Sequence, residues 1–200
     1  MRRALAFVAF AILAGSVLAQ TAERPSVRVG DEWKFVVYYS VPSRTPNRSW
    51  VVTAVTPTAI VGTENGEPLT LTADLGVAES PLVKYSNPRT LSFPLEVGKR
   101  WRYASDWVFK PKGSNGSTVV EVTVLGHERI RVPAGEFEAF RLLAKGSLSG
   151  TSPSGSFYAG ETTTTYWYAP DARAIVKSVY HNPYQGISTV ELVEFRRARP

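Results

Sequence analysis

The sequence predicts an all-β protein: a single antiparallel, strongly curved sheet or incomplete β-barrel, with a β-sandwich as the alternative. Three observations lead to this class. Apolar and polar residues alternate with a period of two, turn residues recur at short intervals, and 12% of the 200 residues are aromatic. The chain is long enough to bury a core without disulfides. It has no cysteine, which excludes disulfides, thiol nucleophiles, zinc ribbons, iron–sulfur sites and a lipid-modified N-terminal cysteine.

Residues 1–19 have the composition of a cleaved secretory signal peptide. Arg2 and Arg3 precede an apolar run over residues 4–14, and small residues follow, with Val17 and Ala19 at the predicted cleavage site. The run is too short to span a bilayer comfortably, because about 20 residues are needed. We therefore expect cleavage after Ala19, a periplasmic or secreted protein, and no transmembrane span after cleavage. Residues 20–26 are expected to form a linker.

The first strand of the mature domain is expected where Trp33, Phe35, Val37 and Tyr39 fall on one face. Further along the chain, Trp101, Tyr103, Ser105, Trp107 and Phe109 alternate in the same way, as do Val120, Val122 and Val124. The other strands that the pattern predicts, in chain order, are residues 49–55, 59–63, 69–73, 137–148, 162–168, 175–180 and 187–195.

Short connections separate these strands, so neighbouring strands are expected to be antiparallel. Turn residues mark the connections at Asn65-Gly66, Asn115-Gly116, Pro133-Ala134-Gly135 and Pro170-Asp171. Residues 73–85 are the best place for a short helix or an irregular bridge. We predict one β-rich domain over residues 27–195, followed by a solvated basic tail over residues 196–200.

A short motif occurs twice. Val29-Gly30-Asp31-Glu32-Trp33-Lys34-Phe35 is similar to Val97-Gly98-Lys99-Arg100-Trp101-Arg102-Tyr103. In each copy, glycine permits a sharp entry into a strand whose tryptophan fills one end of the core. The repeat suggests two similar halves, residues 27–90 and 91–195.

Three segments carry a family resemblance: residues 93–103, Val132-Pro133-Ala134-Gly135-Glu136-Phe137, and Tyr166-Trp167-Tyr168-Ala169-Pro170-Asp171. In order and spacing they resemble exported bacterial proteins of the TapB-like domain-of-unknown-function group. The resemblance implies an exported β-rich fold with no established activity and no catalytic residues to transfer. At the level of fold alone, the chain is also similar to the half-barrel lipoprotein carriers of the bacterial envelope. The second and third motifs themselves are those of a tight turn and of an aromatic strand with its turn.

No catalytic motif stands out. The pattern Gly-x-Ser-x-Gly is absent, and neither His127 nor His181 has a second histidine at metal-ligand spacing. Glu136 and Glu138 share a strand face, but a glycosidase would also need a sugar-binding cleft. The sequence therefore predicts a protein that is not an enzyme, with no cofactor and no metal. A glycan or ester hydrolase is the competing hypothesis.

Aromatic residues on predicted strands are the remaining candidates for function. The formal charge of +6 falls to +4 once residues 1–19 and their two arginines are removed, and it is too scattered to favour nucleic acid. Aromatic side chains either fill the core or line a concave face for a ligand. The candidate ligand-binding residues are Trp33, Trp101, Tyr103, Trp107 and Trp167. We expect a non-enzymatic envelope protein that binds an apolar ligand, a lipid or glycan, or an envelope protein partner.

Overall fold

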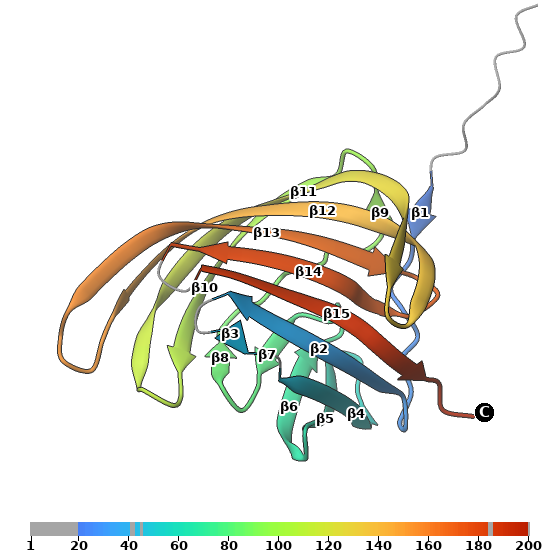
Figure 1. Ribbon diagram of the computed structural model, residues 1–200, viewed down its shortest axis with the longest axis horizontal. Helices are drawn as coiled ribbons and strands as arrows, with labels where there is room; N and C mark the ends of the chain where they lie inside the picture. Colours follow the sequence, from blue (N-terminus) through green and yellow to red (C-terminus); the bar gives the residue numbers. More distant parts are fainter. Residues whose placement is uncertain (1–19, 41–42, 45, 184–185, 200) are drawn as a thin grey trace, which may run out of the picture.

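The computed structural model describes residues 20–40, 43–44, 46–183 and 186–199, and all regular structure within them is β (Figure 1). The predicted all-β class is confirmed. The predicted signal peptide lies outside the described residues. In chain order, the strands are β1 (Thr21–Ala22), β2 (Glu32–Ser40), β3 (Ser43–Arg44), β4 (Asn47–Val55), β5 (Ala59–Glu64), β6 (Glu67–Thr72), β7 (Val77–Glu79), β8 (Val83–Tyr85), β9 (Leu95–Glu96), β10 (Arg100–Phe109), β11 (Ser114–Val132), β12 (Gly135–Thr151), β13 (Phe157–Ala169), β14 (Ala174–Asn182) and β15 (Gly186–Arg196).

Twelve of these strands form a ring of antiparallel pairs. The order runs β2, β4, β5, β6, β7, β8, then β10 to β15 consecutively, and β15 pairs back with β2. Trp33 lies opposite Phe195, and Val37 lies opposite Val190, in this closing pair. The curved sheet therefore closes on itself as a barrel, which differs from the half-barrel of the lipoprotein carriers. Strand β3 pairs antiparallel with the end of β2, while β1 and β9 form a separate two-stranded sheet.

The extent of backbone pairing varies around the ring. Strands β11 and β12 are 19 and 17 residues long and pair along almost their whole length. Residues 73–85, where a helix or irregular bridge was expected, hold no helix; they contain the short strands β7 and β8, three residues each. These two strands are joined through the single pair Glu79 and Lys84. The backbone pairing of the barrel wall is therefore thinnest between β7 and β8.

Two apolar clusters fill the barrel at the end where β2 and β10 begin. The first surrounds Trp33 and Phe35, and the second surrounds Trp101 and Leu142. Leu91, in the segment between β8 and β9, and Leu95, the first residue of β9, add fully buried side chains to the second cluster. Alternation explains this packing, because every second residue of a strand points to the same face. The inward faces of both halves of the ring thus supply most of the core.

The two copies of the sequence repeat have the same local structure. Both glycines have φ of 90°, a left-handed conformation that L side chains rarely adopt. Each motif makes the same backbone bonds to the next long strand along the ring, and each tryptophan donates to a backbone carbonyl. The equivalent bonds are Gly30 N to Val52 O and Gly98 N to Val124 O, both 2.9 Å, and Trp33 Nε1 to Ala172 O and Trp101 Nε1 to Arg89 O, both 2.8 Å.

Both ends of the described chain are attached to the barrel. Residues 20–26, expected to be a linker, include β1, which pairs with β9 and buries Ala22. Arg196 and Arg197, expected to be solvated, bind Glu32 and the carbonyl of Asp171. Both arginines are nevertheless exposed, so the tail carries solvent-accessible charges that also contact strands and turns far away in the sequence.

Candidate functional site

The candidate site lies at the end of the barrel opposite the packed core. Strands β10 to β13 project beyond the rest of the wall there and end in the hairpin loops 110–113 and 152–156 (Figure 1). Their inward face there carries aromatic side chains, hydroxyl groups and glycine, and it is less completely buried than the core clusters at the other end. We call this the open end of the barrel.

Four tyrosines of the inward face interact with one another between the second core cluster, against which Tyr103 and Tyr166 pack, and the open end. Tyr85 on β8 and Tyr103 on β10 interact with each other, and Tyr85 also interacts with Tyr166 on β13 and Tyr180 on β14. All four side chains are half-buried. We call them the tyrosine cluster. It brings together strands that are distant both in the sequence and around the ring.

Burial keeps the phenols of this cluster protonated. Loss of solvent raises the pKa of Tyr85 to about 12, with a smaller contribution from the neighbouring Tyr166 and Tyr180. The same cause raises the pKa of Tyr103, Tyr166 and Tyr180. The Asn182 side-chain amide donates to the Tyr180 hydroxyl over 2.8 Å. Neutral phenols both donate and accept hydrogen bonds while presenting an apolar ring, so the cluster is amphipathic.

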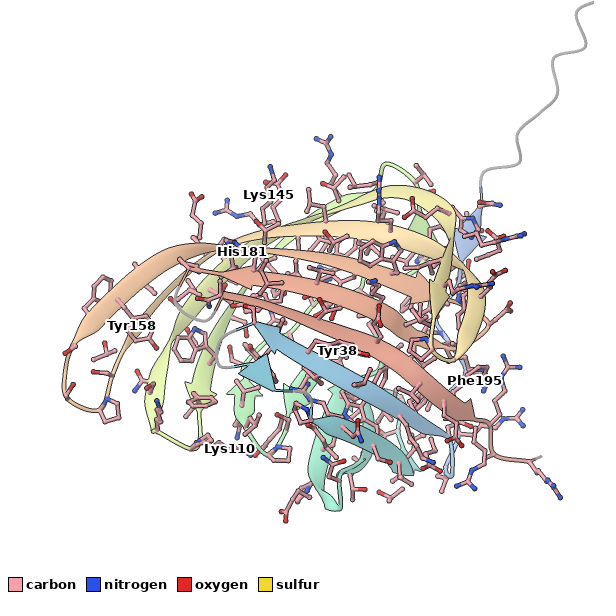
Figure 2. All side chains as sticks on the ribbon, viewed as in Figure 1. Tyr38, Lys110, Lys145, Tyr158, His181 and Phe195 are labelled. Carbon is pink, nitrogen blue, oxygen red and sulfur yellow. The ribbon has the colours of Figure 1, made fainter. Side chains whose placement is uncertain are left out.

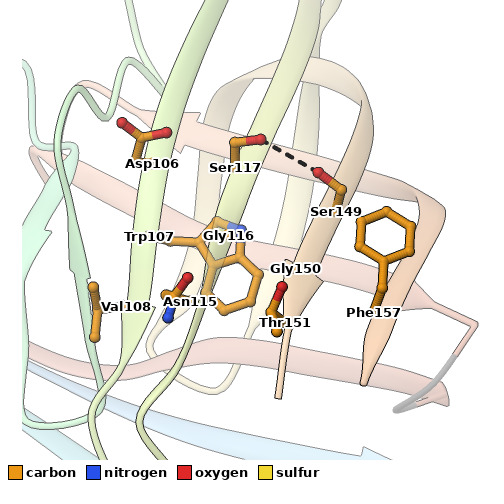
Figure 3. A pocket seen from close by; sticks show the side chains of 10 residues that line it. All are labelled: Asp106, Trp107, Val108, Asn115, Gly116, Ser117, Ser149, Gly150, Thr151 and Phe157. Carbon is orange, nitrogen blue, oxygen red and sulfur yellow. Dashed lines mark hydrogen bonds between the residues drawn. The ribbon is translucent and has the colours of Figure 1, made fainter. Parts of the chain in front are cut away.

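A row of four residues across β10 to β13 continues this inward face. Trp107, Gly116, Gly150 and Tyr158 lie directly opposite one another on successive strands. A Cβ at Gly150 would lie 2.7 Å from the Trp107 indole and 2.8 Å from the Tyr158 ring, so both rings occupy the space above the glycine. Figure 3 shows the Trp107 ring next to this row. The two ring centroids are 6.2 Å apart. Figure 2 shows Tyr158 on the projecting β12–β13 hairpin.

The five sequence-predicted site residues separate into three places. Tyr103 and Trp107 lie on the inward face near the open end. Trp33 and Trp101 are buried in the two core clusters, 4% and 9% exposed. Trp167 is half-buried elsewhere; its indole donates to Glu128 over 2.8 Å, and the Lys177 ammonium lies 5.9 Å from its ring centroid. The structure therefore brings Tyr103 and Trp107 to one end and leaves the three other residues apart.

Sequence reasoning missed Tyr85, Tyr166 and Tyr180. Tyr166 was assigned only to an aromatic strand, and Tyr85 fell in the expected helix or bridge. Period-two alternation could have placed Tyr166 and Tyr180 on inward faces. Nothing in the sequence indicates that β8 approaches β13 and β14, because that contact depends on closure of the ring.

The histidines and paired glutamates lie on other parts of the barrel. His127 Nδ1 is 3.8 Å from Glu138 Oε2, and Glu138 also pairs with Arg129 at 3.0 Å. Glu136 pairs with Arg131 at 2.7 Å. Within the described ranges, no group of three or more His, Asp or Glu side chains is arranged to hold a metal ion. The same part of the chain contains no helix long and apolar enough to cross a bilayer.

The barrel belongs to a class of fold found in exported bacterial proteins, the YmcC-like fold. A protein from Parabacteroides distasonis described as a lipoprotein is 14% identical, with a TM-score of 0.55, and the match covers 88% of this chain and 99% of that one. An exported protein with a YmcC-like fold from Bacteroides fragilis is 15% identical, with a TM-score of 0.54, and the match covers 88% of this chain and 100% of that one. At this identity the likeness shows the fold alone.

No protein-family model and no curated protein matches the chain. The resemblance to the TapB-like group therefore stays a prediction.

Proposed function

We propose that the protein is a non-enzymatic exported protein of the bacterial envelope that binds a small apolar ligand at the open end of its barrel. The tyrosine cluster carries the proposal. The two core clusters mix aliphatic residues with completely or almost completely buried aromatic rings, whereas four half-buried phenols gather next to the second cluster, on the side of the open end, from β8, β10, β13 and β14. Such rings offer apolar contact area at low entropic cost and hydroxyl groups that fix the orientation of a ligand.

The interior limits the size of the ligand. Val122, Leu142 and Tyr168 are completely buried further along the inward face, so the packed core leaves the open end as the contact surface. A compact apolar molecule with a hydrogen-bonding group fits this surface better than a fully enclosed acyl chain. An uncharged ligand also agrees with the charges of the wall. Arg48 on β4 and Glu64 on the adjoining β5 form an ion pair, with 3.4 Å between Arg48 Nε and Glu64 Oε1.

Export is supported by two independent observations. Residues 1–19 have the sequence of a secretory signal peptide. The proteins that share the fold are described as an exported protein and a lipoprotein. We therefore place this chain, cleaved after Ala19, in the periplasm or outside the cell.

Titration with the neutral dye N-phenyl-1-naphthylamine tests the binding site. We expect saturable enhancement of the dye fluorescence with the wild-type mature protein. Tyr180→Ala should weaken dye binding about tenfold, because loss of an aromatic contact removes about 1 kcal/mol or more. Tyr38→Ala is the matched control, because Tyr38 is 43% exposed on the outward face of β2. Near-UV circular dichroism confirms that both variants are folded.

Either of two outcomes overturns the proposal: no saturable binding by the folded wild type, or equal binding by the Tyr180 and Tyr38 variants. Native mass spectrometry of protein purified from its own periplasm, followed by organic extraction, identifies the natural ligand. We expect a mass above that of the bare chain. A bare chain mass, together with absence of dye binding, would direct attention to a protein partner.

A further inference from the structure

A second surface of the projecting strands forms a hollow on the outward face of the barrel wall. Residues on this face alternate with the inward row of Trp107, Gly116 and Gly150, whose backbone forms its floor. The volume of the hollow is about 420 Å³, within the range of small-molecule sites. The outward side chains that line it are Asp106, Val108, Asn115, Ser117, Ser149, Thr151 and Phe157 (Figure 3).

The chemistry of the lining is unusual for an outward sheet face. Phe157 is 72% exposed, the largest exposed fraction among the large apolar side chains of the described residues. Around it are a carboxylate, an amide and three hydroxyl groups, and none of the lining residues is basic. Val108, 43% exposed, adds a second apolar side chain to the same lining. The lining thus combines one apolar plane with several groups that donate and accept hydrogen bonds.

We propose that this hollow binds a neutral glycan. The C–H face of one pyranose ring stacks on the Phe157 ring, and Thr151, directly opposite on β12, hydrogen-bonds its hydroxyls. Asn115 and Asp106 lie two and three strands from Phe157, where they hydrogen-bond further sugar units of the same glycan. Without a basic lining residue, a phosphate or an acidic sugar would have no ion-pair partner in the hollow. An acyl chain would leave the carboxylate, amide and hydroxyl groups without partners. An uncharged, polyhydroxylated ligand matches both the apolar Phe157 ring and the polar side chains of the lining.

Close pairing between β11 and β12 holds the floor of the hollow. A Cβ at Gly116 would lie 2.0 Å from the Ser149 carbonyl oxygen, so glycine allows β11 and β12 to approach here. The Ser117 and Ser149 hydroxyls are 3.3 Å apart and hydrogen-bonded across the same two strands. The outward polar groups are therefore carried by paired strands instead of a loop, which reduces the ordering cost of binding.

Isothermal titration calorimetry with two neutral probes, chitotetraose and maltotetraose, tests the proposal. We expect the wild-type mature protein to bind at least one of them. Phe157→Ala should weaken that binding about tenfold, as expected for a lost aromatic contact, and Phe157→Trp should restore it. Asp106→Ala should also weaken it. Ile187→Ala is the matched control: Ile187 is exposed, on β15, and absent from the lining.

Absence of heat with both probes from the folded wild type overturns the proposal, as does equal binding by Phe157→Ala and Ile187→Ala. Tyr180→Ala separates this hollow from the open end. It should weaken binding of the naphthylamine dye while leaving glycan binding unchanged. If neither glycan binds but the dye still does, the proposal of a glycan site in the hollow is wrong, whereas the proposed apolar-ligand site at the open end stands.

Discussion

Gly116 illustrates how a single residue shapes the candidate sites. The turn predicted at Asn115-Gly116 is wrong, because the chain turns at residues 110–113 and Gly116 lies near the start of the 19-residue β11, where glycine has no advantage as a strand former. Its value lies in the space it leaves, because a side chain would meet the Ser149 carbonyl at 2.0 Å and the Trp107 indole at 2.7 Å. The inward aromatic row and the outward hollow both depend on this absence of a Cβ.

Gly116→Ala should therefore destabilise the protein by about 1–3 kcal/mol, the usual cost of overpacking. Gly126→Ala is the control in the same strand, because a Cβ at that position would have no neighbour within 4 Å. That control should change stability by less than about 1 kcal/mol. Urea denaturation monitored by tryptophan fluorescence measures both. Equal midpoints for the two variants would contradict the role assigned to Gly116.

Asp31 is a second residue whose role only its contacts reveal. It is 1% exposed, and its carboxylate accepts hydrogen bonds from the backbone N–H groups of Arg28 at 2.9 Å and Ala198 at 2.8 Å. Arg173 lies 3.5 Å from the same carboxylate. The side chain thus links the entry to β2 with the C-terminal segment and with the β13–β14 turn.

Asp31→Ala should lower the free energy of unfolding by about 2–4 kcal/mol, because it leaves buried donors without an acceptor. Asp31→Asn retains an acceptor oxygen and should lose less. Glu67→Ala, at an exposed position, provides the control. Thermal unfolding followed by circular dichroism gives the order of stability. A melting temperature for Asp31→Ala equal to that of the control would be inconsistent with this role.

At the scale of elements, the repeated turn before β2 and β10 determines how each half of the ring begins. Nothing lies within 4 Å of a Cβ built on Gly98, so its left-handed φ of 90° is the only requirement for glycine there. At Gly30 the Ala198 side chain lies 3.3 Å from that position as well. Glycine is therefore required at position 98 by backbone conformation alone, and at position 30 by backbone conformation and by packing against Ala198.

Gly98→Ala should destabilise the barrel by about 1–2 kcal/mol through backbone strain alone. Gly30→Ala should cost more, because it adds the contact with Ala198. Guanidinium denaturation of both variants, compared with wild type, measures the two effects. If Gly98→Ala were as stable as wild type, the left-handed turn would not be a source of strain.

At the scale of the whole molecule, closure of the ring creates a pH dependence. Tyr85 has its pKa raised from an ordinary value near 10 to about 12 by burial in the folded state. The unfolded chain therefore releases this phenolic proton first as the pH rises. Stability attributable to Tyr85 is present below pH 10 and is lost between pH 10 and about 12.

We expect the melting temperature to fall between about pH 10 and about pH 12, and Tyr85→Phe to reduce that fall. The loss attributable to this residue is about 2–3 kcal/mol, from about 1.4 kcal/mol per pKa unit. Tyr38→Phe, at an exposed position on the outward face, should leave the wild-type pH dependence unchanged. Identical pH profiles for Tyr85→Phe and wild type would show that Tyr85 does not lose its proton in unfolding.

Local pattern by itself determined most of the strands. Alternation over Trp33 to Tyr39 and over Trp101 to Phe109 predicts β2 and β10 and identifies their inward faces, because side chains alternate between the two faces of a strand. Gly30 and Gly98 of the repeat predict equivalent turns, because glycine permits the sharp turn at the entry to each strand. All of these follow from the preferences of a few neighbouring residues.

Only the tertiary structure decided where these faces meet. Pairing of β15 with β2 closes the ring, and closure brings Tyr85 close to Tyr166 and Tyr180. It also separates Trp33 and Trp101, which enter the packed core, from Trp107, which lies over glycine at the open end. The physical reason is that a periodic pattern specifies which face of a strand is buried, whereas the identity of its neighbours depends on register and ring order across the whole chain.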